Sequence, residues 1–117
     1  MSLREYTAED IEQSIENYRE IEERGRMFEK LEDSPEFQAL ITEGYFKEEA
    51  SRLAILCNDS RLTPEERKEC HSSLNAISSF HQYCSVIKFK ADQAKKQIEA
   101  GLEELQEMRD AENSTEQ

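Results

Sequence analysis

The side chains of this sequence best suited to chemistry are its two histidines and three cysteines. On a helix His81 and Cys84 would share a face, as two metal ligands could. Cys70 and Cys84 are 14 residues apart on what reads as one helix, about 21 Å, so one zinc ion cannot bind both. The same distance excludes a disulfide between them, because that bond needs Cα atoms within about 7 Å. We therefore expect no metal site, and the scattered cysteines, Cys57 included, fit a reducing compartment.

Hydroxyl groups also stand next to both histidines in the sequence. A nucleophile requires an oriented base and a pocket, whereas sequence neighbours of His71 and His81 on a helix point in different directions. No glycine-rich phosphate loop is present, since Gly25, Gly44 and Gly101 each stand alone. The sequence therefore predicts a non-catalytic protein without a cofactor.

Charge is the strongest feature of the composition. There are 27 acidic and 15 basic side chains, and the net charge of −12 makes direct nucleic-acid binding unfavourable. A local basic stretch consists of Lys88, Lys90, Lys95 and Lys96. We expect these lysines to pair with a glutamate-rich first helix, and a phosphate-binding patch is the alternative. The acidic end of the chain could instead dock a basic partner.

The C-terminal half carries a seven-residue repeat of apolar or small residues. Its positions alternate at steps of three and four, which places them in one stripe on a helix. This seam consists of Ile77, Phe80, Cys84, Ile87, Ala91, Ala94, Ile98 and Leu105. Such a stripe would be unfavourable in water, at roughly 25 cal/mol per Å², so it must contact another helix.

Capping signals divide the chain into three helices. Thr7 precedes a first helix at about 8–32, Ser34-Pro35 a second at 35–57, and Thr63-Pro64 a third at 64–110. A rise of 1.5 Å per residue makes the third helix about 69 Å long, which matches the first two laid end to end.

These lengths predict an all-α protein, a long antiparallel helical hairpin whose first arm is broken at Pro35. The alternative is a compact bundle in which the first helix folds back. We expect a single helical domain over residues 1–117, with 1–6 and 111–117 as flexible ends.

A second apolar surface lies off the seam and consists of Phe46, Ala50, Tyr83, Val86 and Phe89. A two-helix hairpin covers one stripe per helix, and large exposed apolar patches are uncommon in soluble monomers. We expect homo-oligomerisation through this surface. Packing of the first helix across it is the alternative.

The sequence contains no apolar run long enough to cross a membrane and no signal-peptide pattern. The high proportion of charged residues, 36%, suits long helices. We therefore expect a soluble, intracellular protein that does not bind a membrane.

Two phrases of the sequence carry a resemblance to a known family. They are Phe37-Gln-Ala-Leu40-Ile41-x-x-Gly44-Tyr45-Phe46-x-x-Glu49-Ala50-x-Arg52-Leu53 and Leu74-x-Ala76-Ile77-x-x-Phe80-x-x-Tyr83. With them, residues 25–105 resemble a family of small helical proteins of tailed bacteriophages that is encoded among virion-structure genes. The resemblance implies a phage origin, a phage structural protein as partner, and a location in the host cytoplasm or the virion.

Two functions fit these expectations. The first is a non-catalytic virion or assembly protein that acts by protein–protein interaction as a helical oligomer. The second is a small acidic inhibitor that binds a host protein, in host takeover or against host defence. Arg19, Arg24, Arg26 and Lys30 interrupt the acidic face of the first helix, which argues against mimicry of DNA.

Overall fold

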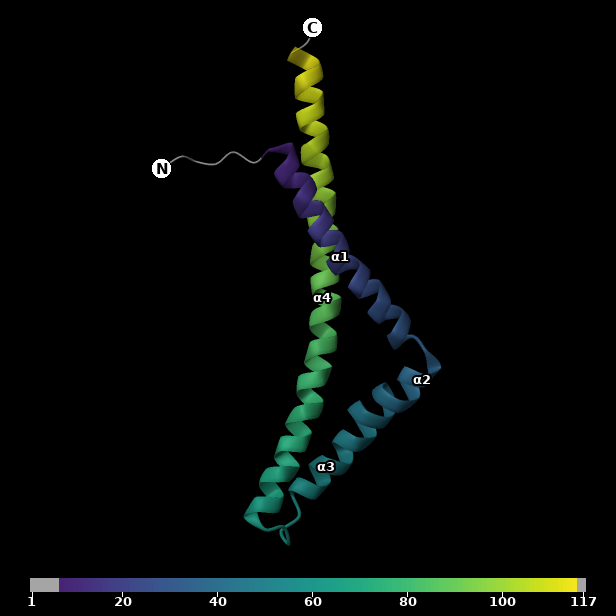
Figure 1. Cartoon of the computed structure of the whole chain (residues 1–117). Coiled ribbons are helices and arrows are strands. Elements are labelled where there is room, and N and C mark those ends of the chain that lie inside the picture. Colours follow the sequence, from purple (N-terminus) through teal and green to yellow (C-terminus); the bar gives the residue numbers. More distant parts are fainter. Residues whose placement is uncertain (1–6, 116–117) are drawn as a thin grey trace, which may run out of the picture. The chain divides into compact units, whose positions relative to one another are not determined.

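The computed structural model describes residues 7–115, in which every regular element is a helix (Figure 1). In chain order the elements are α1 (Ala8–Glu32), α2 (Pro35–Phe37), the π-helix η1 (Gln38–Glu49), α3 (Ala50–Cys57) and α4 (Pro64–Thr115). This order confirms the predicted all-α hairpin, in which α4 is one arm and the other arm is broken at Pro35. Residues 1–6 and 116–117, which belong to the predicted flexible ends, lie outside the described residues.

The described residues form two compact units, each with its own buried cluster. Unit 1 combines the chain up to Arg26 with the chain from Lys88 onward, and unit 2 is the segment between, Met27–Ile87. The sequence predicts a single helical domain, and this division does not test that prediction. The seam of α4 runs through both units without a change in composition, so the sequence gives no sign of the division.

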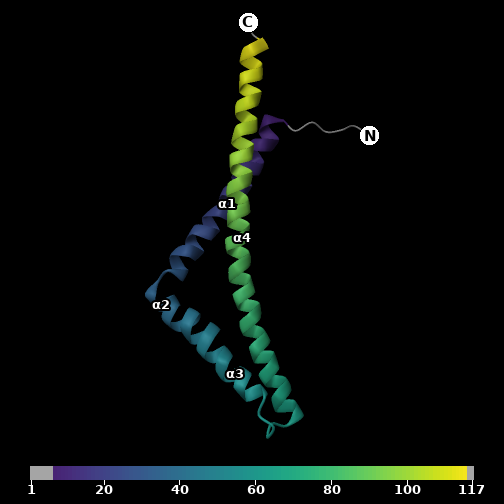
Figure 2. The same cartoon turned by 180° about the vertical axis from the view of Figure 1, so that it is seen from behind.

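In unit 1, α1 packs antiparallel to the C-terminal part of α4 (Figures 1 and 2). Ile11 and Ile15 of α1 are buried together with Ile98 of α4. Later in α1, Gly25 faces Ala91, which comes before Ile98 in the chain, so the two helices run in opposite directions. A Cβ atom at Gly25 would overlap the Cβ of Ala91, and glycine therefore permits the close approach of the two backbones.

In unit 2, α3 and the start of α4 form a hairpin around residues 58–63 (Figures 1 and 2). One of the two buried clusters of unit 2 consists of Leu53, Cys57, Cys70 and Ile77, and the other of Phe28, Phe37 and Cys84. Cys57 and Cys70 form a disulfide whose Cα atoms are 5.8 Å apart. This corrects the expectation of three reduced cysteines, because the tight connection brings the last residue of α3 beside the second turn of α4.

Arg67 closes the same connection by hydrogen bonds. Its Nη1 donates to the backbone carbonyl of Cys57 at 2.6 Å and its Nη2 to that of Asp59 at 3.1 Å. These carbonyls belong to the C-terminal end of α3 and the loop after it, where helix geometry leaves acceptors without partners. In the same connection, the guanidinium of Arg61 donates hydrogen bonds to the carboxylate of Asp59. These hydrogen bonds lower the pKa of the Asp59 carboxyl.

Side-chain caps begin α1, α2 and α4 at the positions that the sequence indicates, Thr7, Ser34 and Thr63. At α4 the cap is reciprocal. The N–H of Glu66 donates to Oγ1 of Thr63 at 3.1 Å, and the N–H of Thr63 donates to Oε1 of Glu66, also at 3.1 Å. Pro35 is the first residue of α2, where its missing N–H costs nothing.

The second predicted helix has the predicted ends but a different interior. Residues 38–49 form a π-helix, with hydrogen bonds between residues i and i+5, where the sequence predicts an α-helix over 35–57. The residues that pack inward explain the difference: Phe37, Ile41, Phe46 and Ala50 follow one another at steps of four, five and four. An α-helical turn of 3.6 residues would rotate Phe46 and Ala50 away from α4, whereas the wider π turn keeps them on one face.

α4 also ends later than predicted, at Thr115 and not at residue 110. Ala111 and Glu112 are good helix formers, and no glycine or proline follows Asp110. Residues 111–115, which the sequence predicts as part of a flexible end, therefore belong to α4.

Candidate functional site

Most of the predicted seam of α4 lies under the other helices. The buried members are Ile77, Cys84, Ala91, Ala94 and Ile98, and Ile87 and Leu105 are partly buried. Phe80 lies at the edge of the seam, with 38% of its surface exposed. Within each unit the seam therefore supports the fold and presents little surface to another molecule.

The five residues of the predicted interaction surface do not lie together. Phe46 and Ala50 pack against buried residues of unit 2, because the π-helix turns them toward α4. Their assignment to a second apolar face assumed α-helical phase, which the structure corrects. Tyr83, Val86 and Phe89 remain exposed on α4, at 62%, 37% and 63%. Since they lie within seven residues of one uninterrupted helix, their relative positions follow from α4 alone.

We call Tyr83, Val86 and Phe89 the α4 strip. Successive members are three residues apart, so they lie on neighbouring turns of the same side of the helix. Two large rings and a branched side chain at these exposures leave apolar area in water at a cost of roughly 25 cal/mol per Å². The strip is the part of the predicted surface that is free to contact another protein.

Four rings form a half-exposed aromatic group in unit 2. The ring centroids of Phe46 and Phe80 are 5.6 Å apart, and those of Phe46 and His81 are 4.9 Å apart at 79°. Tyr45 completes the group, 6.3 Å from Phe80. Edge-to-face pairs of this kind stabilise the contact between η1 and α4. His81 therefore has an aromatic neighbour in Phe46.

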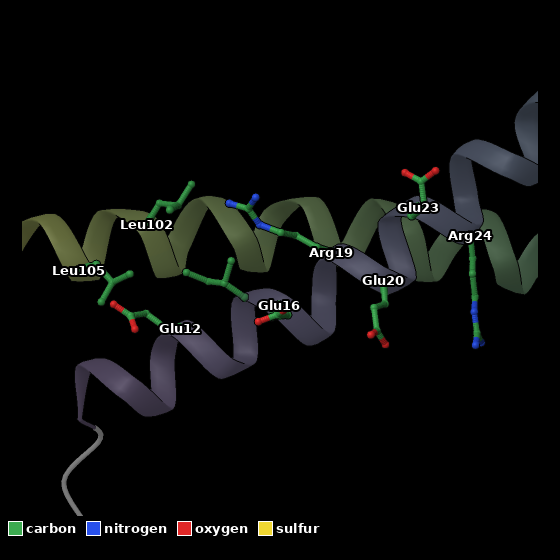
Figure 3. A pocket seen from close by; sticks show the side chains of 9 residues that line it. Glu12, Glu16, Arg19, Glu20, Glu23, Arg24, Leu102 and Leu105 are labelled. Carbon is green, nitrogen blue, oxygen red and sulfur yellow. The ribbon is translucent and has the colours of Figure 1, made fainter.

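Unit 1 contains a groove of about 800 Å³ between α1 and α4 (Figure 3). Its apolar part consists of Ile15, Leu102 and Leu105, and Leu102 is 47% exposed. The charged lining comes from one helix only, α1: it comprises Glu12, Glu16, Arg19, Glu20, Glu23 and Arg24. In Figure 3, Glu12 extends from α1 toward Leu105, and Arg19 reaches across to α4. The groove thus has an apolar floor and a predominantly acidic wall.

Three of the four lysines of the basic stretch of α4 lack the ion pairs predicted for them. Lys90, Lys95 and Lys96 form no ion pair with any residue in the described range 7–115. Their side chains are exposed, and the ion pairs of α1 are internal, such as those of Arg26 with Glu22 and Glu23.

The cysteines and acidic residues form no metal site within residues 7–115, where no group of three or more His, Cys, Asp or Glu side chains could hold an ion. Cys84 is a buried free thiol, and Cys57 and Cys70 are joined. No helix of the described chain is both long and apolar enough to span a membrane.

Some exposed apolar residues escaped the sequence analysis. Ile55 is 76% exposed, Leu40 is 71% exposed and Met27 is 64% exposed. Leu40 lies within the π-helix η1, for which the sequence gives no simple signal. The exposure of Ile55 and Met27 could be predicted from the sequence. Each lies one or two residues from a buried residue of its own α-helix, and such close neighbours point to different sides of a helix.

Comparison with known proteins yields no relative: no protein-family model, curated protein or solved structure matches this chain.

Proposed function

We propose that this chain is a non-catalytic phage protein of the virion or its assembly, which acts by protein–protein interaction and associates with copies of itself. The observation that carries the proposal is the α4 strip, in which Tyr83 and Phe89 keep about two thirds of their surface exposed. Aromatic side chains are enriched at the centres of protein interfaces, where burial returns the most free energy. A phage structural protein is the expected larger partner.

Self-association is tested by multi-angle light scattering at micromolar concentration. We expect a mass above the 13.7 kDa of one chain, and a Tyr83→Glu substitution should shift it toward the monomer. The matched control is Ser85→Glu, which adds the same charge two residues away, where the side chain faces another direction. A monomeric wild-type protein, or equal masses for the two variants, would refute the role of the strip.

Association with the virion needs a separate test. Purified virions are probed with an antibody against the chain and the signal is calibrated against known amounts of protein. Presence at a fixed ratio to the capsid protein supports the proposal. Absence from virions and from assembly intermediates would contradict it.

The second candidate function is an acidic inhibitor that binds a host protein. The specific observation in its favour is that Glu12, Glu16 and Glu20 are exposed and form no ion pair with a residue in the described range. A pull-down from infected cells distinguishes the two. A stoichiometric host protein favours inhibition, and a phage structural protein favours assembly.

A further inference from the structure

Unit 1 presents two exposed charged surfaces of opposite sign. The first is the groove, where Glu12, Glu16 and Glu20 recur at four-residue spacing and so lie along one side of α1. Four glutamates line the groove against two arginines, and the floor includes the half-exposed Leu102.

The second surface is the part of α4 around Phe89, the last member of the α4 strip. Lys96 follows Phe89 by seven residues, which places these two side chains on the same face of the helix, and Lys90 follows Phe89 directly, about 100° further round the helix. Lys90 and Lys96 form no ion pair with a described residue, and the ring of Phe89 is 63% exposed. An exposed aromatic ring with one free cation on its own face and a second next to it in the chain is therefore the chemical complement of a leucine floor beside free carboxylates.

From this complementarity we propose that the groove of one copy receives the Phe89 face of α4 from a second copy. Phe89 would lie on Leu102 and Leu105, with Lys90 and Lys96 opposite the carboxylates of α1. The inference rests on the proposed self-association and names the surface that the α4 strip meets. Because groove and strip are different surfaces, the contact is heterologous, and copies add head to tail.

A head-to-tail contact makes a prediction that a two-fold contact does not. The groove variant combines Glu12→Lys with Glu16→Lys. The second variant combines Lys90→Glu with Lys96→Glu, and we call it the strip variant because these lysines accompany Phe89 of the α4 strip. Each retains one intact surface. Alone, each is expected to be monomeric at a concentration where the wild type is associated. Mixed in equal amounts, they should associate beyond two chains again, since the two intact surfaces fit each other and the two reversed surfaces are complementary with the signs exchanged.

The controls change the same charges elsewhere. Glu65→Lys with Glu69→Lys alters the net charge from −12 to −8, as the groove variant does, and Lys30→Glu with Lys68→Glu alters it to −16, as the strip variant does. All four positions are exposed and lie in unit 2. We expect both controls to associate like the wild type. Far-UV circular dichroism of every variant verifies that the helices are retained.

A further variant carries all four charge reversals and should regain association beyond two chains, because the two surfaces are complementary again with the signs exchanged. Wild-type association should also weaken when salt is raised from 0.05 to about 0.5 M, since exposed charges are screened.

Each other result overturns the inference. If the groove variant associates while the strip variant does not, copies meet strip to strip; the proposed function stands and the groove has no part in it. If the controls dissociate like the test variants, net charge alone governs association. If the wild type is monomeric, the inference and the proposed function fail together.

Discussion

At the scale of single residues, hydrogen bonds between side chains and the backbone fix where α1, α2 and α4 begin. Thr63 and Glu66 satisfy each other's N–H groups, and Arg67 satisfies the carbonyls at the end of α3. The caps could be predicted, because a cap residue and its partner are three residues apart in the sequence. The hydrogen bond from Arg67 to Cys57 spans ten residues and depends on the conformation of the loop, so it cannot be predicted from a local sequence pattern.

The cap of α4 should depend on pH. Hydrogen bonds with Thr63 lower the pKa of the Glu66 carboxyl from its ordinary value of 4.5. A carboxyl with a lowered pKa stabilises the folded chain above its unfolded value, and the contribution is lost as pH falls through the folded value. Glu66→Gln should therefore lower the thermal midpoint at pH 7 and have less effect at pH 3. The matched control is Glu65→Gln, and equal pH dependence of the two variants would contradict the prediction.

The disulfide allows a second test at this scale. Unfolded without reductant, the protein should show one reactive thiol, that of Cys84, and three after reduction. A loop closed over 13 residues contributes about 3 kcal/mol in the chain-entropy model, so reduction should lower the thermal midpoint. Three reactive thiols before reduction, in protein purified without reductant, would refute the bond.

At the scale of elements, the lengths and ends of the helices follow from caps, prolines and periodicity, and the π-helix does not. The α-helical reading of 35–57 placed Phe46 and Ala50 outside, because it assumed turns of 3.6 residues throughout. The inward residues at steps of four, five and four fit π geometry, but this pattern is visible only when their packing partners are known. Because the helix was predicted as an α-helix, Phe46 and Ala50 were wrongly assigned to the predicted interaction surface.

Paired alanine substitutions measure which residues of this arm face inward. Phe46→Ala should lower the free energy of unfolding by about 2 kcal/mol, less than for a fully buried phenylalanine because Phe46 is partly exposed. Leu40→Ala should change it by less than about 0.5 kcal/mol, since Leu40 is 71% exposed. Urea unfolding followed by circular dichroism gives both values. Similar losses for the two variants would show that the arm is not in the π phase.

At the scale of the whole molecule, the division into two units is the feature that sequence analysis could not supply. Periodicity identifies α4 as one helix and its seam as continuous, and both are present. The division arises from which helices pack on each half of that seam, which is information about contacts between distant residues. Each unit has a separate buried cluster, so local stability should differ between them.

Hydrogen exchange with a substitution at Gly25 tests this division. Gly25→Ala places a methyl group against Ala91 and should destabilise unit 1 by roughly 1 to 3 kcal/mol. Amides of residues 8–24 and 92–108 should then exchange faster, while those of 50–57 and 66–80 change little. Adding Ala91→Gly removes the methyl group that the new alanine would overlap. It should therefore restore the protection of these amides from exchange. Uniform acceleration over both units would show that the chain opens as one body.

The placement of the crosslink has a mechanical consequence. Both ends of the described chain belong to unit 1, and the disulfide lies in unit 2. When the two ends are pulled apart, the contacts between the antiparallel helices of unit 1 break one after another. Each step therefore requires little force. The segment between Cys57 and Cys70 stays closed under load, which shortens the fully stretched oxidised chain by roughly 40 Å relative to the reduced one.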